Sequence, residues 1–221
     1  MIAAIVFDMD GVIVDTEQVW DEVREQLVAD WGGRYSPAAQ RAMMGMSSGE
    51  WSRYMHDELG VSQAPEAIND EVVRRMLDRY RADLPLIDGA VEAVRNLSGS
   101  FPLAVASSSN RPLIDAVLST ADIAGCFAAT VSSEEVPRGK PSPDVYLEAA
   151  RRLGVAPGLC AAVEDSANGI RSAAAAGMHV IAYPNRHYGP EADALALADA
   201  VIDSLGELVA VVRAAETPGR G

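Results

Sequence analysis

Two aspartates near the start of the chain give the first indication of chemistry. Asp8 and Asp10 follow the apolar run Ile2–Phe7 and precede Gly11, in the segment FDMDGVIVDT. Alternate residues of an extended chain point to the same side, so both carboxylates can face one site. One carboxylate can attack phosphorus to form an acyl phosphate while its neighbour protonates the leaving oxygen. The pair therefore favours phosphoryl transfer over the alternative, an acidic turn at the end of a strand.

Two other segments offer groups suited to an anion. The backbone N–H groups of Ser108 and Ser109 lie near an expected helix start, where they can bind negative charge, although serines at strand ends are also common in turns. Lys140 is the only lysine among 18 basic residues. A compact ammonium differs from the planar guanidinium of arginine in reach and shape. The single lysine therefore indicates a specific role, against the alternative of a solvated surface lysine.

A second acidic pair follows a later apolar run. Glu164 and Asp165 come directly after Leu159–Val163. Carboxylate oxygens are the ligands that Mg²⁺ prefers, and Mg²⁺ in phosphoryl-transfer sites is held by one or two of them together with substrate phosphate and water. The pair therefore predicts a magnesium site. The alternative is that Asp165 is an ordinary helix N-cap.

Alternating strands and helices position these residues. Short apolar runs predict strands at Ile2–Phe7, Pro102–Ala106, Ala128–Val131, Leu159–Val163, His179–Ala182 and Ala200–Ile202. Between them, helical patterns cover Ala90–Leu97, Arg111–Thr120, Asp144–Leu153, Asn168–Ala176 and Leu205–Ala214. This alternation predicts an α/β fold with a doubly wound, mostly parallel sheet. Ligands bind beyond the carboxyl ends of the strands in such sheets, which is where both acidic pairs fall.

One region interrupts the alternation. Between residues 16 and 84 the sequence predicts only helices, over Glu17–Trp31, Pro37–Met44, Glu50–Leu59 and Pro65–Arg81. We therefore expect an α/β core domain made of residues 1–15 and 85–215, and an inserted helical domain made of residues 16–84. The last residues, 216–221, are expected to form a disordered tail.

The acidic motifs resemble those of a known family. The pattern DxDGxxxDT, here Asp8, Asp10, Gly11, Asp15 and Thr16, is similar to the first motif of the haloacid dehalogenase superfamily, in its phosphatase and phosphomutase branch. The three later motifs follow in the same order, as Ser107 in VASSSN, Lys140 in RGKPSPDVY, and Glu164 with Asp165 in VEDSANGI. Together with the sheet and the insert, the resemblance covers nearly the whole chain. It implies a Rossmann-like core with an inserted α-helical cap.

The resemblance also implies roles for the motif residues. Asp8 would be the nucleophile that becomes a phosphoaspartate, and Asp10 the general acid and base. Ser107 would hydrogen-bond the transferring phosphoryl group, and Lys140 would bridge the nucleophile and the phosphate. The cofactor Mg²⁺ would be bound by Asp8, the backbone carbonyl of Asp10, and Asp165. Glu164 would be a further ligand or a supporting partner.

Several residues are candidates for contacting the substrate. Thr16 closes the first motif, and Ser108 adds a donor beside Ser107. Gly45 and Trp51 lie in the insert, where related caps place a specificity loop that faces the active site. The alternative for this segment is a turn between helices whose large side chains pack inward.

The insert narrows the choice of activity within the family. It falls between the first and second motifs, as in subgroup I members with a helical cap. Asp10 argues against dehalogenation, and a cap without lysine argues against phosphonate hydrolysis. Phosphomutases of the branch carry a histidine, a lysine and an arginine in the cap, at positions aligned here with Trp20, Met44 and Ser48.

We therefore expect a Mg²⁺-dependent phosphatase that hydrolyses a sugar or polyol monophosphate. The cap cations of a mutase are missing at the aligned positions, although Arg41 or Arg53 could reach inward from flanking turns. The first alternative is a phosphomutase of the β-phosphoglucomutase type. The second is a protein that binds a phosphorylated ligand without turnover.

Composition narrows the possible partners. The 221 residues carry a net charge of −14, which disfavours nucleic acid and anionic membranes, and no apolar stretch reaches the roughly 20 residues of a membrane span. The apolar start ends too early for a signal peptide, and two distant cysteines in apolar contexts do not indicate disulfides, so we expect a cytoplasmic protein. We expect a small-molecule phosphorylated substrate as the partner, and a monomer or weak homodimer.

Overall fold

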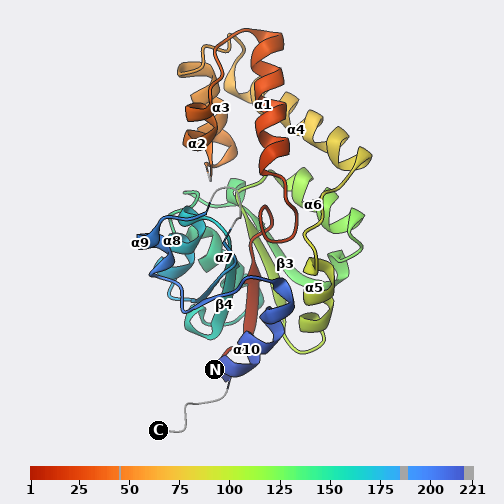
Figure 1. Cartoon of the computed structure of the whole chain (residues 1–221), viewed down its shortest axis with the longest axis vertical. Coiled ribbons are helices and arrows are strands. Elements are labelled where there is room, and N and C mark those ends of the chain that lie inside the picture. Colours follow the sequence, from red (N-terminus) through yellow and green to blue (C-terminus); the bar gives the residue numbers. More distant parts are fainter. Residues whose placement is uncertain (45, 185–188, 217–221) are drawn as a thin grey trace.

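The computed structural model describes residues 1–44, 46–184 and 189–216, and a six-stranded sheet lies at its centre (Figure 1). The strands are β1 (Ala4–Phe7), β2 (Leu103–Ser107), β3 (Phe127–Ser132), β4 (Cys160–Glu164), β5 (His179–Ala182) and β6 (Ala200–Val201). Their order is β3-β2-β1-β4-β5-β6, and every neighbouring pair is parallel. The first strand is therefore central, with the later strands added on either side of it.

The apolar runs form strands because the sheet is covered on both faces. In β1, Ile5 and Phe7 belong to one hydrophobic cluster, and Ala4 and Val6 belong to the other. This alternation follows from the two-residue period of an extended chain. A strand buried on both sides needs apolar residues at every position, which is the pattern that the sequence shows.

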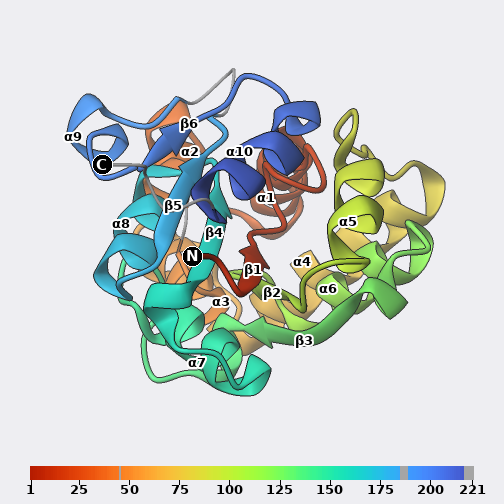
Figure 2. The ribbon, with the colours of Figure 1, turned by 90° about the horizontal axis from the view of Figure 1, so that it is seen from below.

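Helices cover the two faces of the sheet (Figure 2). One face carries α5 (Ala90–Ser98), α6 (Arg111–Thr120) and α10 (Leu208–Glu216), and the other carries α7 (Asp144–Leu153), α8 (Ala167–Ala175) and α9 (Ala192–Leu195). Short 3₁₀ turns complete the connections at η1 (Ala124–Cys126), η2 (Ser133–Glu135), η3 (Pro157–Leu159) and η4 (Leu205–Glu207). The predicted doubly wound α/β fold is confirmed.

Four helices form a separate group beyond the carboxyl ends of the strands (Figure 1). They are α1 (Glu17–Trp31), α2 (Pro37–Met43), α3 (Ser48–Asp57) and α4 (Pro65–Ala82). Their starts follow local rules, because α2 and α4 begin with proline and α3 begins with a capping box between Ser47 and Glu50. We refer to this group as the cap. Its interior holds large side chains such as Trp51 and Met55.

Most predicted boundaries agree with the structure to within two residues. The exceptions are α9, which is too short to show a helical period, and the segment from Leu205, which starts as 3₁₀ before α10. The predicted tail, 216–221, begins one residue too early, because α10 includes Glu216, and residues 217–221 lie outside the described part. Among the described helices, none has the length and apolar character needed to cross a membrane.

Candidate active site

The parallel sheet brings the sequence motifs to one edge. Asp8 follows β1 directly, Glu164 is the last residue of β4, and Asp165 comes next. β1 pairs with β2 on one side and with β4 on the other, so β2 and β3 are added on one side of β1 and the later strands on the opposite side. Such a switch point is where α/β sheets bind ligands. Lys140 reaches the same place from the segment that precedes α7.

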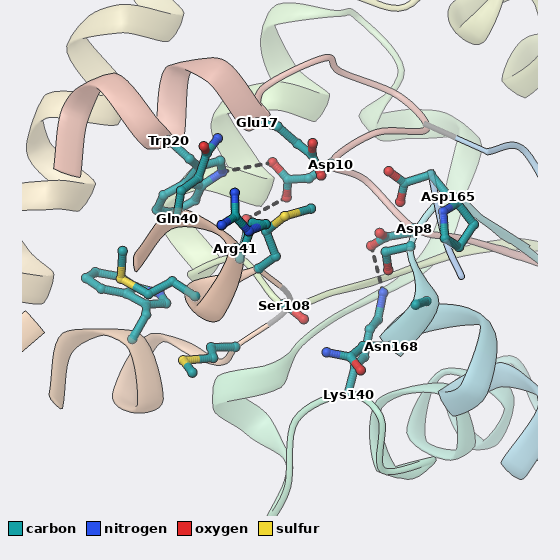
Figure 3. A pocket seen from close by; sticks show the side chains of 18 of the residues that line it. Asp8, Asp10, Glu17, Trp20, Gln40, Arg41, Ser108, Lys140, Asp165 and Asn168 are labelled. Atoms are coloured by element: carbon teal, nitrogen blue, oxygen red, sulfur yellow. Dashed lines mark hydrogen bonds and ion pairs between the residues drawn. The ribbon is translucent and has the colours of Figure 1, made fainter. Parts of the chain in front are cut away.

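Lys140 lies between two carboxylates, of which Figure 3 shows that of Asp8. Its Nζ is 2.9 Å from Oδ1 of Asp8 and donates to Oε1 of Glu164 at 2.5 Å. All three side chains are almost completely buried. Burial alone would lower the pKa of Lys140, but the two carboxylates raise it above its usual value, so the side chain is an ammonium.

Glu164 is fully occupied by partners from the protein. Besides Lys140, Oε1 accepts a hydrogen bond from the Tyr146 hydroxyl at 2.7 Å. Oε2 accepts from the backbone N–H groups of Asp165 at 3.0 Å and Ser166 at 3.2 Å. Of the two roles predicted for Glu164, this arrangement favours the supporting one, in which the carboxylate positions Lys140.

Asp8 and Asp165 form the part of the site that is suited to a cation. One carboxylate oxygen of each lies within 4.8 Å of the others in a buried cluster with Glu164. Burial, followed by repulsion from Glu164, raises the pKa of Asp8 to about 8 and that of Asp165 well above its usual range. Buried carboxylates that repel each other and offer hard oxygen atoms fit a divalent cation, which would relieve the repulsion. The residues present therefore fit a divalent metal.

Gly11 lets the backbone pass close to this cluster. Its φ of +84° is one that other residues rarely adopt, and a Cβ there would lie 1.9 Å from Oδ2 of Asp165. The glycine of the first motif is thus required both by its conformation and by the carboxylate beside it.

Asp10 is held by three hydroxyl or N–H donors. Oδ1 accepts from the Thr16 hydroxyl at 2.5 Å and from Nε1 of Trp20 at 3.2 Å, and Oδ2 accepts from the Ser109 hydroxyl at 2.7 Å. Figure 3 shows the bond from Trp20 to Asp10. Trp20 belongs to the cap and Ser109 to the core. The carboxylate is therefore fixed at the place where the cap meets the sheet.

The predicted phosphate-binding residues occupy two different environments. Ser107 is fully buried at the end of β2, and its hydroxyl accepts from the backbone N–H of Ser109 at 3.0 Å. Thr16 is also fully buried and is used by Asp10. Neither contributes to the pocket wall, whereas Ser108 does, and its Oγ is buried without a hydrogen-bond partner among the described residues.

A cleft of about 440 Å³ connects these groups to the cap. Its cap wall includes Trp20, Trp51 and Arg24, whose rings and guanidinium stack on one another. The two indole rings meet edge to face at 6.0 Å between centroids. Trp51 is thus both a core residue of the cap and part of the pocket wall. Its position agrees with both alternatives for this segment, the loop that faces the site and the turn whose large side chains pack inward.

The remaining cap predictions have separate outcomes. Arg41 lines the pocket, as does Met44, whereas Arg53 is exposed on the cap and does not. Ser48 is buried, and its hydroxyl donates to Glu134 at 3.1 Å, outside the pocket wall. Gly45 lies outside the described residues.

Several residues of the site were not predicted from the sequence. Among them are Glu17, Asp21, Arg24, the hydroxyl of Ser109, and Tyr146. Arg24 had a detectable signal, because it stands in a helical stripe with Trp20 and Leu27, where a charged residue is unexpected. The sequence analysis named Arg41 and Arg53 as possible cap cations but not Arg24, which lines the pocket from the middle of α1.

A family comparison agrees with this geometry. Residues 2–177 match the model of the haloacid dehalogenase-like hydrolases. The chain belongs to this family. It is therefore an enzyme of a hydrolase family, and its buried acidic cluster of Asp8, Glu164 and Asp165 lies at the carboxyl edge of the sheet.

Individual relatives include several sugar and polyol phosphatases. The chain is 34% identical over 218 residues to hexitol phosphatase B of Escherichia coli, covering 95% of both proteins, and 34% identical over 185 residues to the fructose-1-phosphate phosphatase YqaB of the same organism, covering 81% of this chain and 95% of that protein. It is also similar to CbbY of Rhodobacter sphaeroides in complex with xylulose-1,5-bisphosphate, with 26% identity, a TM-score of 0.81, and coverage of 94% and 96%.

Proposed function

We propose that this protein is a Mg²⁺-dependent phosphatase that hydrolyses a sugar or polyol monophosphate through a phosphoaspartate. The observation that carries the proposal is the pairing of Asp8, 2.9 Å from Lys140, with a second carboxylate, Asp10, in the wall of the same cleft. The similarity to hexitol and fructose-1-phosphate phosphatases supports the class of substrate.

In the first half-reaction, a carboxylate oxygen of Asp8 attacks the phosphorus of the monoester. The P–O bond to the leaving group breaks, and Asp10 donates its proton to the departing alcohol oxygen. Lys140 offsets the negative charge that builds on the phosphoryl oxygens and on Asp8. The products of this step are the free alcohol and the aspartyl phosphate.

In the second half-reaction, Asp10 takes a proton from a water molecule, which attacks the phosphorus of the aspartyl phosphate. The bond between phosphorus and Asp8 breaks, and inorganic phosphate and the free carboxylate are formed. The same residue therefore acts first as an acid and then as a base. In this proposal, the backbone N–H and the hydroxyl of Ser108, which lines the cleft, bind the phosphoryl oxygens.

Asp8 and Asp165 would hold the Mg²⁺, with the backbone carbonyl of Asp10 as the third predicted protein ligand. When bound, the ion supplies positive charge that lowers the repulsion between the nucleophile and the phosphoryl group. Glu164 keeps Lys140 in place beside it.

The nucleophile is tested by Asp8→Asn, which removes the attacking oxyanion while keeping the size of the side chain. We expect phosphate release from an aryl phosphate to fall to background with the fold intact by circular dichroism. Asp122→Asn is the matched control, because Asp122 is exposed and its φ of +53° suits asparagine equally well. Wild-type turnover in freshly prepared Asp8→Asn would reject the mechanism.

The metal is tested by chelation. Removing divalent ions should reduce phosphate release by orders of magnitude and lower the melting temperature, because Asp8 and Asp165 then repel each other. Added Mg²⁺ should restore both. Ca²⁺, which prefers more ligands and looser geometry, should restore the melting temperature but little turnover. Full activity in the presence of chelator would reject the metal assignment.

A phosphomutase activity is the second candidate, favoured by the guanidinium groups of Arg24 and Arg41 in the pocket wall. A mutase must hold the distal phosphate of a bisphosphate, which cationic cap groups can do. The test is conversion of β-glucose 1-phosphate to glucose 6-phosphate with a bisphosphate primer. We expect little conversion; a kcat/KM above that for phosphate release would promote this candidate.

A further inference from the structure

Among the described residues, none accepts a hydrogen bond from the buried guanidinium of Arg24. The residue is 7% exposed, and it makes no hydrogen bond or ion pair with any residue that the structure describes. Its contacts are with the faces of Trp20 and Trp51, whose ring centroids lie 4.6 and 5.0 Å from the guanidinium carbon. Burial lowers the pKa of Arg24 to about 10, which still leaves it charged at neutral pH.

Stacking on two indoles does not by itself explain such a residue. A guanidinium carries five N–H donors, and a buried cation without acceptors costs several kcal/mol relative to an apolar side chain of similar volume. Nε of Arg24 is completely buried and unpartnered, and the side chain forms part of the pocket wall. The terminal nitrogens Nη1 and Nη2 also have no partner among the described residues but are not completely buried, so their N–H donors are available to a molecule inside the cleft.

Arg24 is one of four residues that α1 presents to the cleft. The others are Glu17, Trp20 and Asp21, so that the set recurs at the three- and four-residue spacing of one helix face. Glu17 has a buried Oε2 without a hydrogen-bond partner among the described residues. Asp21 accepts a hydrogen bond from Tyr35 with one oxygen, at 2.5 Å. The face thus alternates acceptors, an aromatic ring and donors.

The chemistry of this face suits hydroxyl groups better than a second anion. Each hydroxyl both donates and accepts, so it can use the carboxylates of Glu17 and Asp21 as well as the guanidinium of Arg24. A phosphate or carboxylate at the same place would gain Arg24 but would be repelled by both acidic side chains. An indole beside these groups offers an apolar face to the carbon chain.

The position of Arg24 sets a length. Glu17 and Arg24 are separated by two helical turns, about 10 Å along the axis. The Trp20 indole lies between Asp10 and Arg24, because its Nε1 donates to Asp10 and the Arg24 guanidinium packs over its ring. With C–C bonds of about 1.5 Å, the two bonds of a three-carbon leaving group cover less than a third of that distance, whereas the four or five bonds of a five- or six-carbon chain cover up to about 6 to 7.5 Å of it.

We propose that this face of α1 binds the hydroxyl chain of an open-chain polyol monophosphate, and that Arg24 contacts the hydroxyls farthest from phosphorus. Arg24 is then a specificity-determining residue that gives the enzyme a preference for five- and six-carbon chains. This inference rests on the proposed phosphatase function and adds the length and charge of the preferred leaving group.

The experiment compares wild type with Arg24→Met on glycerol 3-phosphate, erythritol 4-phosphate, ribitol 5-phosphate, sorbitol 6-phosphate and an aryl phosphate. Wild-type kcat/KM should rise with chain length. Arg24→Met should lose about 10- to 100-fold on the two longest substrates, the loss expected for one or two charge-assisted hydrogen bonds, and less than twofold on glycerol 3-phosphate and the aryl phosphate. Methionine fills the space between the indoles, so the fold should persist.

Arg53→Met is the matched control, because it removes an exposed cap arginine outside the pocket wall and should change none of these values. An equal loss of kcat/KM on all substrates, or no loss on sorbitol 6-phosphate, would overturn the inference. Wild-type preference for 6-phosphogluconate or a sugar bisphosphate over sorbitol 6-phosphate, lost in Arg24→Met, would show an anion subsite instead.

A separate measurement keeps the inference distinct from the proposed function. If wild type with Mg²⁺ releases phosphate from none of these compounds, the phosphatase proposal fails. Calorimetric binding of the same series to Asp8→Asn protein does not depend on turnover. Affinity that increases with chain length, and loses that increase in Arg24→Met, supports the inference; affinity independent of chain length contradicts it.

Discussion

Replacing Lys140 by methionine should destabilise the protein far more than the loss of an ordinary lysine. Its side chain is 3% exposed and lies between Asp8 and Glu164, at 2.9 and 2.5 Å. Methionine has a similar length but no charge, so the substitution leaves two buried carboxylates facing each other. Removing one partner of a buried ion pair costs about 3–5 kcal/mol.

The surroundings of Glu164 place the expected loss toward the lower part of that range. Its carboxylate keeps hydrogen bonds from the Tyr146 hydroxyl and from two backbone N–H groups after Lys140 is gone. We therefore expect the free energy of unfolding to fall by about 3 kcal/mol in chelator. Mg²⁺ should restore part of it by binding Asp8 and Asp165 in the folded state.

The assay is urea denaturation followed by circular dichroism, with chelator and with Mg²⁺. Arg138→Met is the matched control, because Arg138 is two residues away and 72% exposed in its ion pair with Asp144, so its loss should cost less than about 0.5 kcal/mol. Adding Glu164→Gln to Lys140→Met removes one of the repelling charges and should recover about 1–2 kcal/mol. Equal shifts for Lys140→Met and Arg138→Met, or further destabilisation by the second substitution, would refute the reasoning.

Three further predictions follow from the same contacts. Gly169→Ala should lower both stability and turnover, because a Cβ there would lie 1.8 Å from the carboxylate of Glu164 at the end of β4. Gly49→Ala is the control and should be neutral or stabilising, because a Cβ there would meet no atom within 4 Å. Similar melting temperatures for the two variants would contradict this prediction. Trp20→Phe removes the 3.2 Å hydrogen bond to Asp10. It should lower kcat for an aryl phosphate about tenfold, which corresponds to the weakest hydrogen bonds made to charged groups. An unchanged kcat would show that this hydrogen bond does not position the Asp10 carboxylate. Burial raises the pKa of Glu17 from 4.5 to about 7, so the folded protein binds a proton that the unfolded chain lacks between these pH values, and stability falls as pH rises through that window. Glu17→Gln should remove about 1–2 kcal/mol of that fall in stability, after allowance for partial exposure of the side chain. If the melting temperatures of both proteins changed in parallel with pH from 5 to 8, the assignment would be contradicted.

The core of the site could be predicted because it depends on strand ends. A buried parallel strand has an unmistakable apolar run, and the residue that follows it must lie at the carboxyl edge of the sheet. That rule places Asp8 and Asp165 at the same edge. They meet because β1 and β4 are neighbours, and this order of the strands could not be predicted from the local pattern.

The cap wall could not be predicted in the same way. In the sequence, Arg24 resembles a solvated helix residue. Its burial depends on Trp51, which lies on another helix 27 residues later. The sequence assigns Trp51 to the expected specificity segment but does not indicate that it contacts Arg24. The Ser109 hydroxyl is a similar case, because its hydrogen bond joins residues 99 positions apart. Side-chain contacts of this range follow from packing between elements, which neither hydrophobic period nor capping signals encode.

The residues proposed for the chemistry and those proposed for recognition of the leaving group come from different parts of the structure. Asp8, Lys140 and Asp165 come from the sheet edge, whereas the face that carries Arg24 belongs to the cap. Turnover of an aryl phosphate should therefore depend on Lys140 and be insensitive to Arg24, while the preference for longer chains should show the reverse. Trp20 is the exception, because its indole N–H contacts Asp10 while its ring supports the guanidinium of Arg24. A substitution there should change both properties together, since it is the one described side chain that contacts both the proposed acid and the proposed hydroxyl-binding residue.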